Sequence, residues 1–374
     1  MLDSVLYTMA LTRLTGYNFH VAVRLFRELG DGKAVFDHRH DIAAVLPEAT
    51  PRLQELLSNW DDALSRAEAE LSFIEKNRIK PLLMGQPDYP QRLMDCPDAP
   101  ILLFYMGTAN LNQQRVINII GTRHATVYGQ DIIRNFLADL GAQGIQPLVV
   151  SGLAYGIDIC AHREALAHGF ETVGVLAHGF DEIYPPRHRD TARQMLQQGG
   201  LLTEYMSQTR ADKLNFVKRN RIVAGMCDAT ILVESASKGG GLITCSIAQD
   251  YGRSVFAFPG AVNAEYSMGC NQLIRNNGAE LITSASDFIE AMGWQNDVLL
   301  QEAKSGGIER ELFPNLSDDE RRVVQLLSDR GDMQPNVLSL QANIPIGSLT
   351  ALLFQLEMKG VVRQLAGGSY HLLR

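Results

Sequence analysis

The chain has 374 residues, which favours two or three domains, and 46% of its residues are hydrophobic, enough for globular cores. It contains no run of 18 apolar residues and no cleavage-type pattern near its N-terminus, so we expect neither a membrane span nor a signal peptide. A formal net charge of −8 excludes a general attraction to nucleic acid, so any such binding requires a local cluster of cations. The five cysteines are scattered without a C-x-x-C pair, which indicates reduced thiols in a cytoplasmic protein and argues against a zinc or other metal site.

Residues 1–78 show apolar residues at helical spacing and are expected to form a small helical domain. Within it, Gly16–Ala22 half matches a helix-hairpin-helix turn, with Asn18 where a second glycine would stand. Asparagine tolerates the left-handed conformation, so the turn can be kept. Such a turn either binds phosphates through backbone amides or is simply a tight helical corner, and the residues leave both open. The following segment, Pro81–Tyr105, is interrupted by prolines and is expected to be irregular.

Residues 115–294 alternate short apolar runs with helical stretches. Strands are predicted at 116–120, 147–150, 172–176, 201–205, 230–234 and 254–258. Runs this rich in Val, Ile and Leu, separated by helices, predict an α/β fold: a Rossmann-like, mostly parallel sheet with helices on both faces, over residues 79–294. Ligands of such sheets bind beyond the carboxyl ends of the strands.

Residues 295–314 have the composition of a linker, and residues 315–374 read as a separate domain. Ser317 is a helix cap followed by acids, and two further helices are expected near Asn336–Ala342 and Gly347–Lys359. A hairpin around Ala366-Gly367-Gly368 completes a winged-helix pattern. The candidate recognition helix lies in Gln341–Met358, which contains no Lys or Arg, so this winged helix is expected to contact protein rather than to read DNA.

The segment Asn215–Gly225 combines Phe216 with three cations, Lys218, Arg219 and Arg221. Cations beside an aromatic ring can grip a phosphate chain that carries bases. Equally, Arg219 and Arg221 can form structural ion pairs while Phe216 packs in the core, and the spacing alone leaves both readings open. Other distinctive residues also follow predicted strands, namely Gly121-Thr122-Arg123 and three glycines, 239–241, that precede Thr244. In a parallel sheet these loops share one edge, so the guanidiniums of Arg123, Arg219 and Arg221 are expected to converge there.

Recognisable catalytic patterns are few. No P-loop, full dinucleotide fingerprint or G-x-S-x-G elbow occurs. Asp158 and His162 are four residues apart on one helix face, a spacing that more often supports a helix than forms a catalytic pair. The turn Ser151–Asp158 is expected to serve packing, with Gly152 and Gly156 allowing close approach and the role of Ser151 open.

A series of blocks in order now matches a known family: GTR, VVSGLAYGIDICAH, VLAHGFDEIYPPRHRD, NFVKRNRIVAG, SKGGGLIT, GRSVFAFPG and GAELIT. Together they resemble the bacterial DNA-processing protein A (DprA/Smf) family over roughly residues 80–294. Weaker likeness reaches both ends, as a sterile-alpha-motif-like N-terminal domain and a C-terminal winged helix.

The resemblance implies a single-stranded DNA-binding protein, without enzymatic activity or cofactor, that protects incoming DNA and loads the RecA recombinase in natural transformation. It also implies a homodimer formed through the Rossmann-like domain, which we expect near the helix start at Gly269–Ile274. Carried over by motif, the implied DNA-binding residues are Gly121, Thr122, Arg123, Asn215, Phe216, Arg219, Asn220 and Arg221. Neighbouring positions add Lys213, Lys218, Gly239, Gly240, Gly241 and Thr244.

One departure from the family pattern concerns the glycine loop. The family usually reads S-G-S-L-I-T where this chain has G-G-G-L-I-T, so the loop is expected to bind through backbone amides and Thr244 only. The same turn resembles the P-G-G-x-G-T-x-x-E signature of nucleotide phosphoribohydrolases, a rival function. Those enzymes need a glutamate three residues past the threonine, and Ile247, which stands there, cannot act as an acid or base.

Overall fold

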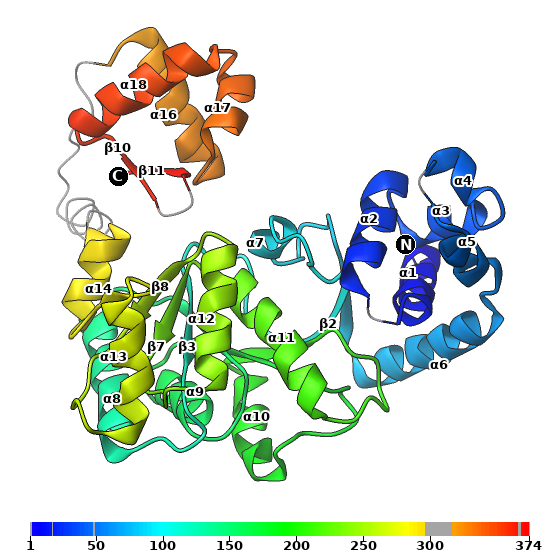
Figure 1. The fold of residues 1–374 in the computed structure, drawn as a ribbon, viewed down its shortest axis with the longest axis horizontal. Coiled ribbons are helices and arrows are strands. Elements are labelled where there is room, and N and C mark those ends of the chain that lie inside the picture. Colours follow the sequence, from blue (N-terminus) through cyan, green and yellow to red (C-terminus); the bar gives the residue numbers. More distant parts are fainter. Residues whose placement is uncertain (1, 17, 48, 296–315, 366–367, 374) are drawn as a thin grey trace.

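The computed structural model describes residues 2–16, 18–47, 49–295, 316–365 and 368–373. Figure 1 shows three parts in chain order: a helical N-terminal part, a central sheet covered by helices, and a small C-terminal part. The predicted linker, 295–314, lies almost wholly outside the described residues.

The N-terminal part is built of short helices, as predicted. They are α1 (Leu2–Leu14), α2 (Phe19–Leu29), α3 (Gly32–Asp37), α4 (Ile42–Val45), α5 (Pro51–Ser58) and α6 (Asp61–Asn77). Helix α5 begins where Thr50 accepts a hydrogen bond from the Leu53 amide and Pro51 takes the first position. At the half-matched turn, Asn18 precedes α2 with φ −80° and ψ 92°, so the expectation that its backbone would be left-handed is wrong.

The central sheet has nine strands in the order β1-β2-β6-β5-β4-β3-β7-β8-β9. Their bounds are β1 (Lys80–Leu83), β2 (Leu102–Gly107), β3 (Val116–Ile120), β4 (Leu148–Ser151), β5 (Thr172–Val175), β6 (Gly199–Thr203), β7 (Ala229–Leu232), β8 (Ser254–Ala257) and β9 (Glu280–Leu281). All neighbours from β6 to β9 are parallel, whereas β1 and β2 add an antiparallel edge. The prediction that residues 81–105 are irregular is therefore wrong in part.

Helices cover both faces of this sheet (Figure 1). They are α7 (Gln91–Met94), α8 (Val127–Ala142), α9 (Ile157–Ala167), α10 (Arg189–Met195), α11 (Lys213–Gly225), α12 (Gly240–Asp250), α13 (Met268–Arg275) and α14 (Ala285–Met292). Alternate strand residues face opposite ways: Ile117 and Ile119 pack with α8, α9 and α14, whereas Val116 and Ile120 belong to the cluster that contains α11 and α12. This burial on both faces gives the Rossmann-like architecture that the sequence predicts.

Helix α6 is fastened to the loop that follows β6. Buried Glu70 accepts hydrogen bonds from the Ser207 amide at 2.9 Å and the Ser207 hydroxyl at 2.6 Å, and Arg66 donates to the Ser207 carbonyl. One cluster of buried apolar side chains is also continuous from α1 and α2 to the sheet. The N-terminal helices therefore help to fix the chain that leads into α11.

The C-terminal part is a winged helix, again as predicted. It comprises α16 (Asp318–Arg330), α17 (Pro335–Ala342), α18 (Ile346–Met358), β10 (Val362–Gln364) and β11 (Tyr370–Leu372). Ser317 and Glu320 cap α16 reciprocally, in the capping box expected from the sequence. Arg363 donates a hydrogen bond of 3.3 Å to the carbonyl of Glu290 in the last turn of α14, which joins the winged helix to the central part.

Within the described ranges, no single helix is long and apolar enough to cross a membrane. Only α17 and α18 taken together have the required length and composition, and they are bent by 108° at the break between them.

Candidate nucleic-acid interface

The loops after β3, β4 and β7 meet at the carboxyl edge of the sheet. The Thr122 backbone accepts a hydrogen bond from the Ile157 amide at 3.1 Å and donates one to the Glu234 carbonyl at 2.7 Å. Gly156 has φ +77°, and a side chain there would lie 2.2 Å from the Thr122 carbonyl oxygen. Gly156 therefore lets the turn after β4 press against Thr122 and Arg123, which confirms its predicted packing role.

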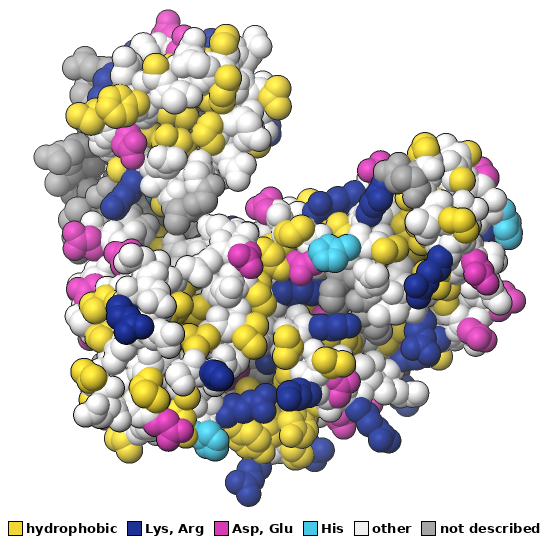
Figure 2. Space-filling model, in the orientation of Figure 1, with side chains coloured by type: hydrophobic (Ala, Val, Ile, Leu, Met, Phe, Trp, Pro, Cys, Tyr) yellow, Lys and Arg dark blue, Asp and Glu magenta, His cyan; other side chains and the backbone are white. Residues whose placement is uncertain are grey.

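Arg123 and Phe216 come together at this edge although they are far apart in sequence. The Arg123 side chain is exposed, and its guanidinium carbon lies 5.3 Å from the centre of the half-buried Phe216 ring. Phe216 also contacts Tyr184, with ring centres 5.8 Å apart. Figure 2 shows Lys and Arg side chains around a hydrophobic patch in the lower half of the view, below α11 and α12 of Figure 1. The arrangement can offer one cation to a phosphate and one ring to a base.

Helix α11 carries further polar side chains toward the same region. It starts after Asp212, whose carboxylate accepts a hydrogen bond from the Asn215 amide at 2.9 Å. Lys213 and Lys218 are exposed, and Asn220, four residues after Phe216, is half-buried. Asn215 donates its side-chain amide to the Arg210 carbonyl at 3.3 Å. These four residues remain predicted contacts, compatible with a surface role.

Arg219 and Arg221 are buried rather than exposed. Their relative exposures are only 3% and 5%, so the expected cluster of three guanidiniums at the surface is wrong, although Arg219 does reach the predicted carboxyl edge from below. Arg221 pairs with buried Glu204 and donates to the Asp98 carbonyl at 2.7 Å. Arg219 donates to the carbonyls of Gly152 at 2.6 Å and Val175, at the ends of β4 and β5. Arg221 thus forms the structural ion pair that the sequence left open, whereas Arg219 bonds two carbonyls, and a DNA contact from either arginine stays a prediction.

Gly152 makes room for this buried guanidinium, since a side chain there would lie 2.3 Å from an Arg219 nitrogen. Asp158 is also buried and accepts a hydrogen bond from the Gly152 amide at 3.1 Å. Burial raises the pKa of Asp158 and lowers the pKa of Arg219, and each group opposes the shift of the other. Asp158 and Arg219 thus compensate one another beneath the loops that form the edge.

Asp158 does not pair with His162 as a catalytic couple would. His162 is buried, and its Nδ1 bonds the Thr172 hydroxyl at 2.7 Å. Ser151 is buried as well and donates to the Ile119 carbonyl at 2.7 Å. These polar groups tie strands and helix together inside the fold.

The glycine loop starts α12, with Gly239 at the cap position and no side-chain cap. Gly240 has open space around it, whereas Gly241 packs against Leu232. The uncapped amides point the positive end of a helix outward, which suits an anion. Thr244 is only 3% exposed and donates to the Gly240 carbonyl at 3.2 Å, so the expectation that its side chain is presented at the surface is wrong.

Two exposed tyrosines that the sequence did not single out lie at the same edge. Tyr155 follows β4 and Tyr184 follows β5, and they are 41% and 45% exposed. Tyr155 contacts the His188 ring, with centres 5.1 Å apart. The available signal was that each tyrosine stands in the segment between a predicted strand and the next helix, five residues after strand 147–150 for Tyr155 and eight after strand 172–176 for Tyr184.

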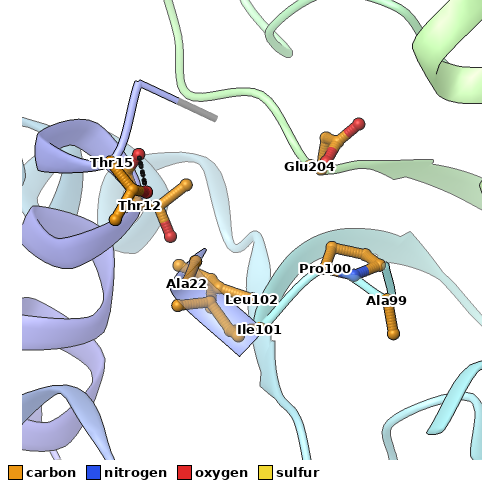
Figure 3. A pocket seen from close by; sticks show the side chains of 8 residues that line it. All are labelled: Thr12, Thr15, Ala22, Ala99, Pro100, Ile101, Leu102 and Glu204. Carbon is orange, nitrogen blue, oxygen red and sulfur yellow. Dashed lines mark hydrogen bonds between the residues drawn. The ribbon is translucent and has the colours of Figure 1, made fainter. Parts of the chain in front are cut away.

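An enclosed cavity of about 10 Å³ lies between the N-terminal helices and the sheet, lined by Thr12, Thr15 and Glu204 among others (Figure 3). It has room for about one water molecule. Across the described part of the chain, no group of three or more His, Cys, Asp or Glu side chains is placed to hold a metal ion. The carboxyl edge of the sheet, where a guanidinium and aromatic rings meet, is the stronger candidate for function.

Comparison with known proteins gives matches over most of the chain. The model of the family DNA recombination-mediator protein A matches residues 80–293, and the DprA winged helix domain matches residues 311–368. Protein Smf of Synechocystis is 31% identical over 329 residues, which cover 80% of this chain and 82% of the relative.

Two solved structures are similar as well. DNA processing protein A of Streptococcus pneumoniae matches with a TM-score of 0.58 and 28% identity, over 72% of this chain and 97% of the other. DNA processing protein A of Helicobacter pylori, described for its single-stranded DNA binding mode, matches with a TM-score of 0.51 and 27% identity, over 60% and 97%. The chain therefore belongs to the DNA recombination-mediator protein A (DprA/Smf) family.

Proposed function

We propose that this chain binds single-stranded DNA across the carboxyl edge of its sheet. The carrying observation is the exposed Arg123 guanidinium 5.3 Å from the Phe216 ring, on a chain whose net charge is −8. A single-stranded nucleotide presents a phosphate and the face of an unpaired base, which this pair of side chains complements. Lys213, Lys218 and the amides of Gly239–Gly241 would add phosphate contacts around it.

Family membership in DNA processing and the DNA-binding neighbour from Helicobacter pylori support this proposal. A duplex hides the faces of its bases, so the ring contact favours unpaired DNA. Phosphate contacts ignore sequence, so binding should be similar for strands of any sequence.

The test is fluorescence anisotropy with labelled oligo-dT and a duplex of equal length, over a series of salt concentrations. With three or four phosphates neutralised, the slope of log affinity against log salt should be roughly −2 to −3, at about −0.7 per contact. Arg123→Ala should weaken binding of all strands and flatten the slope by less than one unit. Arg193→Ala is the control, because the Arg193 side chain is 78% exposed and forms an ion pair with Asp190 of its own helix. If Arg123→Ala, folded by circular dichroism, binds as tightly as the parent, the proposed interface is refuted.

We further propose that the bound strand is protected from nucleases and passed to the RecA recombinase, and that the chain acts as a cytoplasmic homodimer in natural transformation or homologous recombination. The role in DNA processing that family membership gives supports this step. A RecA strand-exchange assay on DNA coated with single-strand-binding protein tests it, since loading should shorten the lag before exchange begins. An unchanged lag would contradict the loading role.

We propose no enzymatic activity. Half-buried Ile247 stands where the phosphoribohydrolase signature has a glutamate, and a hydrocarbon side chain cannot transfer a proton. Incubation with nucleoside monophosphates should release no free base, and base release would favour the rival function.

A further inference from the structure

Exposed aromatic rings at the carboxyl edge extend beyond Phe216. Tyr155 and Tyr184 are 41% and 45% exposed, and they belong to loops that follow neighbouring parallel strands, β4 and β5. On most protein surfaces such rings occur singly. Here they belong to one connected set with Phe216 and Arg123.

The connections can be followed ring by ring. Tyr155 meets the His188 ring at 5.1 Å and 71°, and His188 lies four residues after Tyr184 on the same loop. Tyr184 meets Phe216 at 5.8 Å and 53°, and Phe216 lies beneath the Arg123 guanidinium. The two ends of the set, Tyr155 and Arg123, are also neighbours, because Gly156, next to Tyr155, packs against the Arg123 backbone.

Hydrogen bonds fix the Tyr184 backbone and the buried His188 ring against which Tyr155 packs. His188 is only 4% exposed, and its Nδ1 lies 2.8 Å from the Leu153 carbonyl oxygen. The Tyr184 amide donates to His178 Nε2 at 3.2 Å. Rings positioned before binding lose less conformational entropy when a base stacks on them.

The hydroxyl groups of the two tyrosines make no hydrogen bonds within the described structure. Neither the Tyr155 nor the Tyr184 hydroxyl has a hydrogen-bond partner among the described residues, whereas the similarly exposed Tyr128 donates to the Pro259 carbonyl at 2.6 Å. Each ring therefore packs against one neighbouring ring while its hydroxyl and part of its surface stay available to a ligand. One cation is placed in this set by contact, since the Arg123 guanidinium lies over the Phe216 ring that Tyr184 touches.

We propose that Tyr155 and Tyr184 are base-stacking residues that, with Phe216, form a surface of three rings for the unpaired bases of a DNA strand. The proposal rests on the proposed single-stranded DNA function and adds two stacking positions to it. Stacking accepts any base, because every base has a π face, so these residues supply affinity without sequence preference.

The test compares the parent with Tyr155→Ala, Tyr184→Ala and the double variant on dT12. Each single Ala variant should bind about 5- to 150-fold more weakly, the range expected for the loss of one stacked base. The salt slope should not change, because a ring releases no counterions. Tyr155→Phe and Tyr184→Phe should stay within twofold of the parent, since the ring remains. Phe354→Ala, at a 63% exposed aromatic residue of the winged helix, is the control and should bind like the parent.

A second arm uses a strand of the same length whose central nucleotides are abasic, which keeps the phosphates and removes the rings. The parent should bind this strand more weakly, and the Ala variants should bind it about as well as the parent does. If the Ala variants match the parent on dT12 while Arg123→Ala is weakened, the DNA function stands and the stacking proposal is overturned. If the parent binds neither strand, both proposals fall. Thermal unfolding of each variant confirms that it is folded.

Discussion

Arg221 provides a sharp test of whether the cations of α11 serve the fold or the DNA. Its side chain is 6% exposed and pairs with Glu204, which is 2% exposed, and it also bonds the Asp98 carbonyl. Burial raises the pKa of Glu204, and Arg221 is the largest opposing influence. Arg221→Met keeps the volume and removes the charge, so it leaves the Glu204 carboxyl buried without its cation.

Removing one partner of a buried pair costs about 3–5 kcal/mol, a large part of the roughly 5–15 kcal/mol of a typical domain. For a domain of this size that corresponds to a fall in the melting temperature of roughly 6–20 °C. The double variant Arg221→Met/Glu204→Leu should regain most of the loss, because no buried charge is left unpaired. Arg193→Met, at an exposed i, i+3 pair, should change stability by less than about 0.5 kcal/mol.

Urea unfolding followed by Trp294 fluorescence measures these differences. Trp294 packs on Phe288, with ring centres 5.2 Å apart, and Trp60→Phe in every variant removes the other tryptophan signal. At a temperature where Arg221→Met is fully folded, it should bind oligo-dT within twofold of the parent. An unchanged unfolding midpoint together with lost DNA affinity would show that Arg221 serves the DNA and refute the reasoning.

Three further predictions can be tested. Deleting residues 306–374 should leave single-stranded affinity within tenfold, because α18 (Ile346–Met358) carries no Lys or Arg; a larger loss would contradict a protein-contact role for the winged helix. Burial lowers the pKa of His162 to about 3 in the folded protein, compared with about 6.5 in the unfolded chain. Between these two pH values the unfolded state binds a proton at His162 and the folded state does not. Stability should therefore fall by about 1.4 kcal/mol per pH unit between roughly pH 6 and 4 from this residue, and urea midpoints of His162→Asn should lack that component; parallel curves would refute it. Light scattering at micromolar concentration should give twice 41.3 kDa, and the monomer mass would contradict the proposed homodimer.

The sequence predicted those strands best whose burial is complete and whose residues all favour extended backbone. Residues 116–120, all buried, form β3 with the predicted bounds. By contrast, β6 begins two residues early, at Gly199 and Gly200, which are poor strand formers. Gly200 is needed because a side chain there would lie 2.6 Å from the Tyr105 ring of β2, a contact that no local pattern contains. Strand β1 was missed because it contains Pro81, which an edge strand tolerates and a central one does not.

For the site, the sequence identified the loops and the helix that carry the candidate residues, and it placed Arg123 at the surface. It did not predict that Arg219 and Arg221 are buried. Arg219 finds its acceptors at Gly152 and Val175, and Arg221 finds Glu204, all on other strands or loops. Spacing within α11 cannot show these partners. The sequence did not single out Tyr155, because the glycines of the same turn already had an explanation in packing.

Helix α11 thus divides its residues between two roles. Buried Arg219 fastens the ends of β4 and β5 through two carbonyls, and the same loops carry Tyr155 and Tyr184. Half-buried Phe216 and exposed Lys213 and Lys218 face outward from the same helix. If the proposed function holds, we predict that a substitution at Arg219 weakens DNA binding by displacing the tyrosines and leaves the salt slope unchanged. Loss of affinity in α11 variants consequently identifies a DNA contact only when the salt slope changes or when the fold is as stable as in the parent.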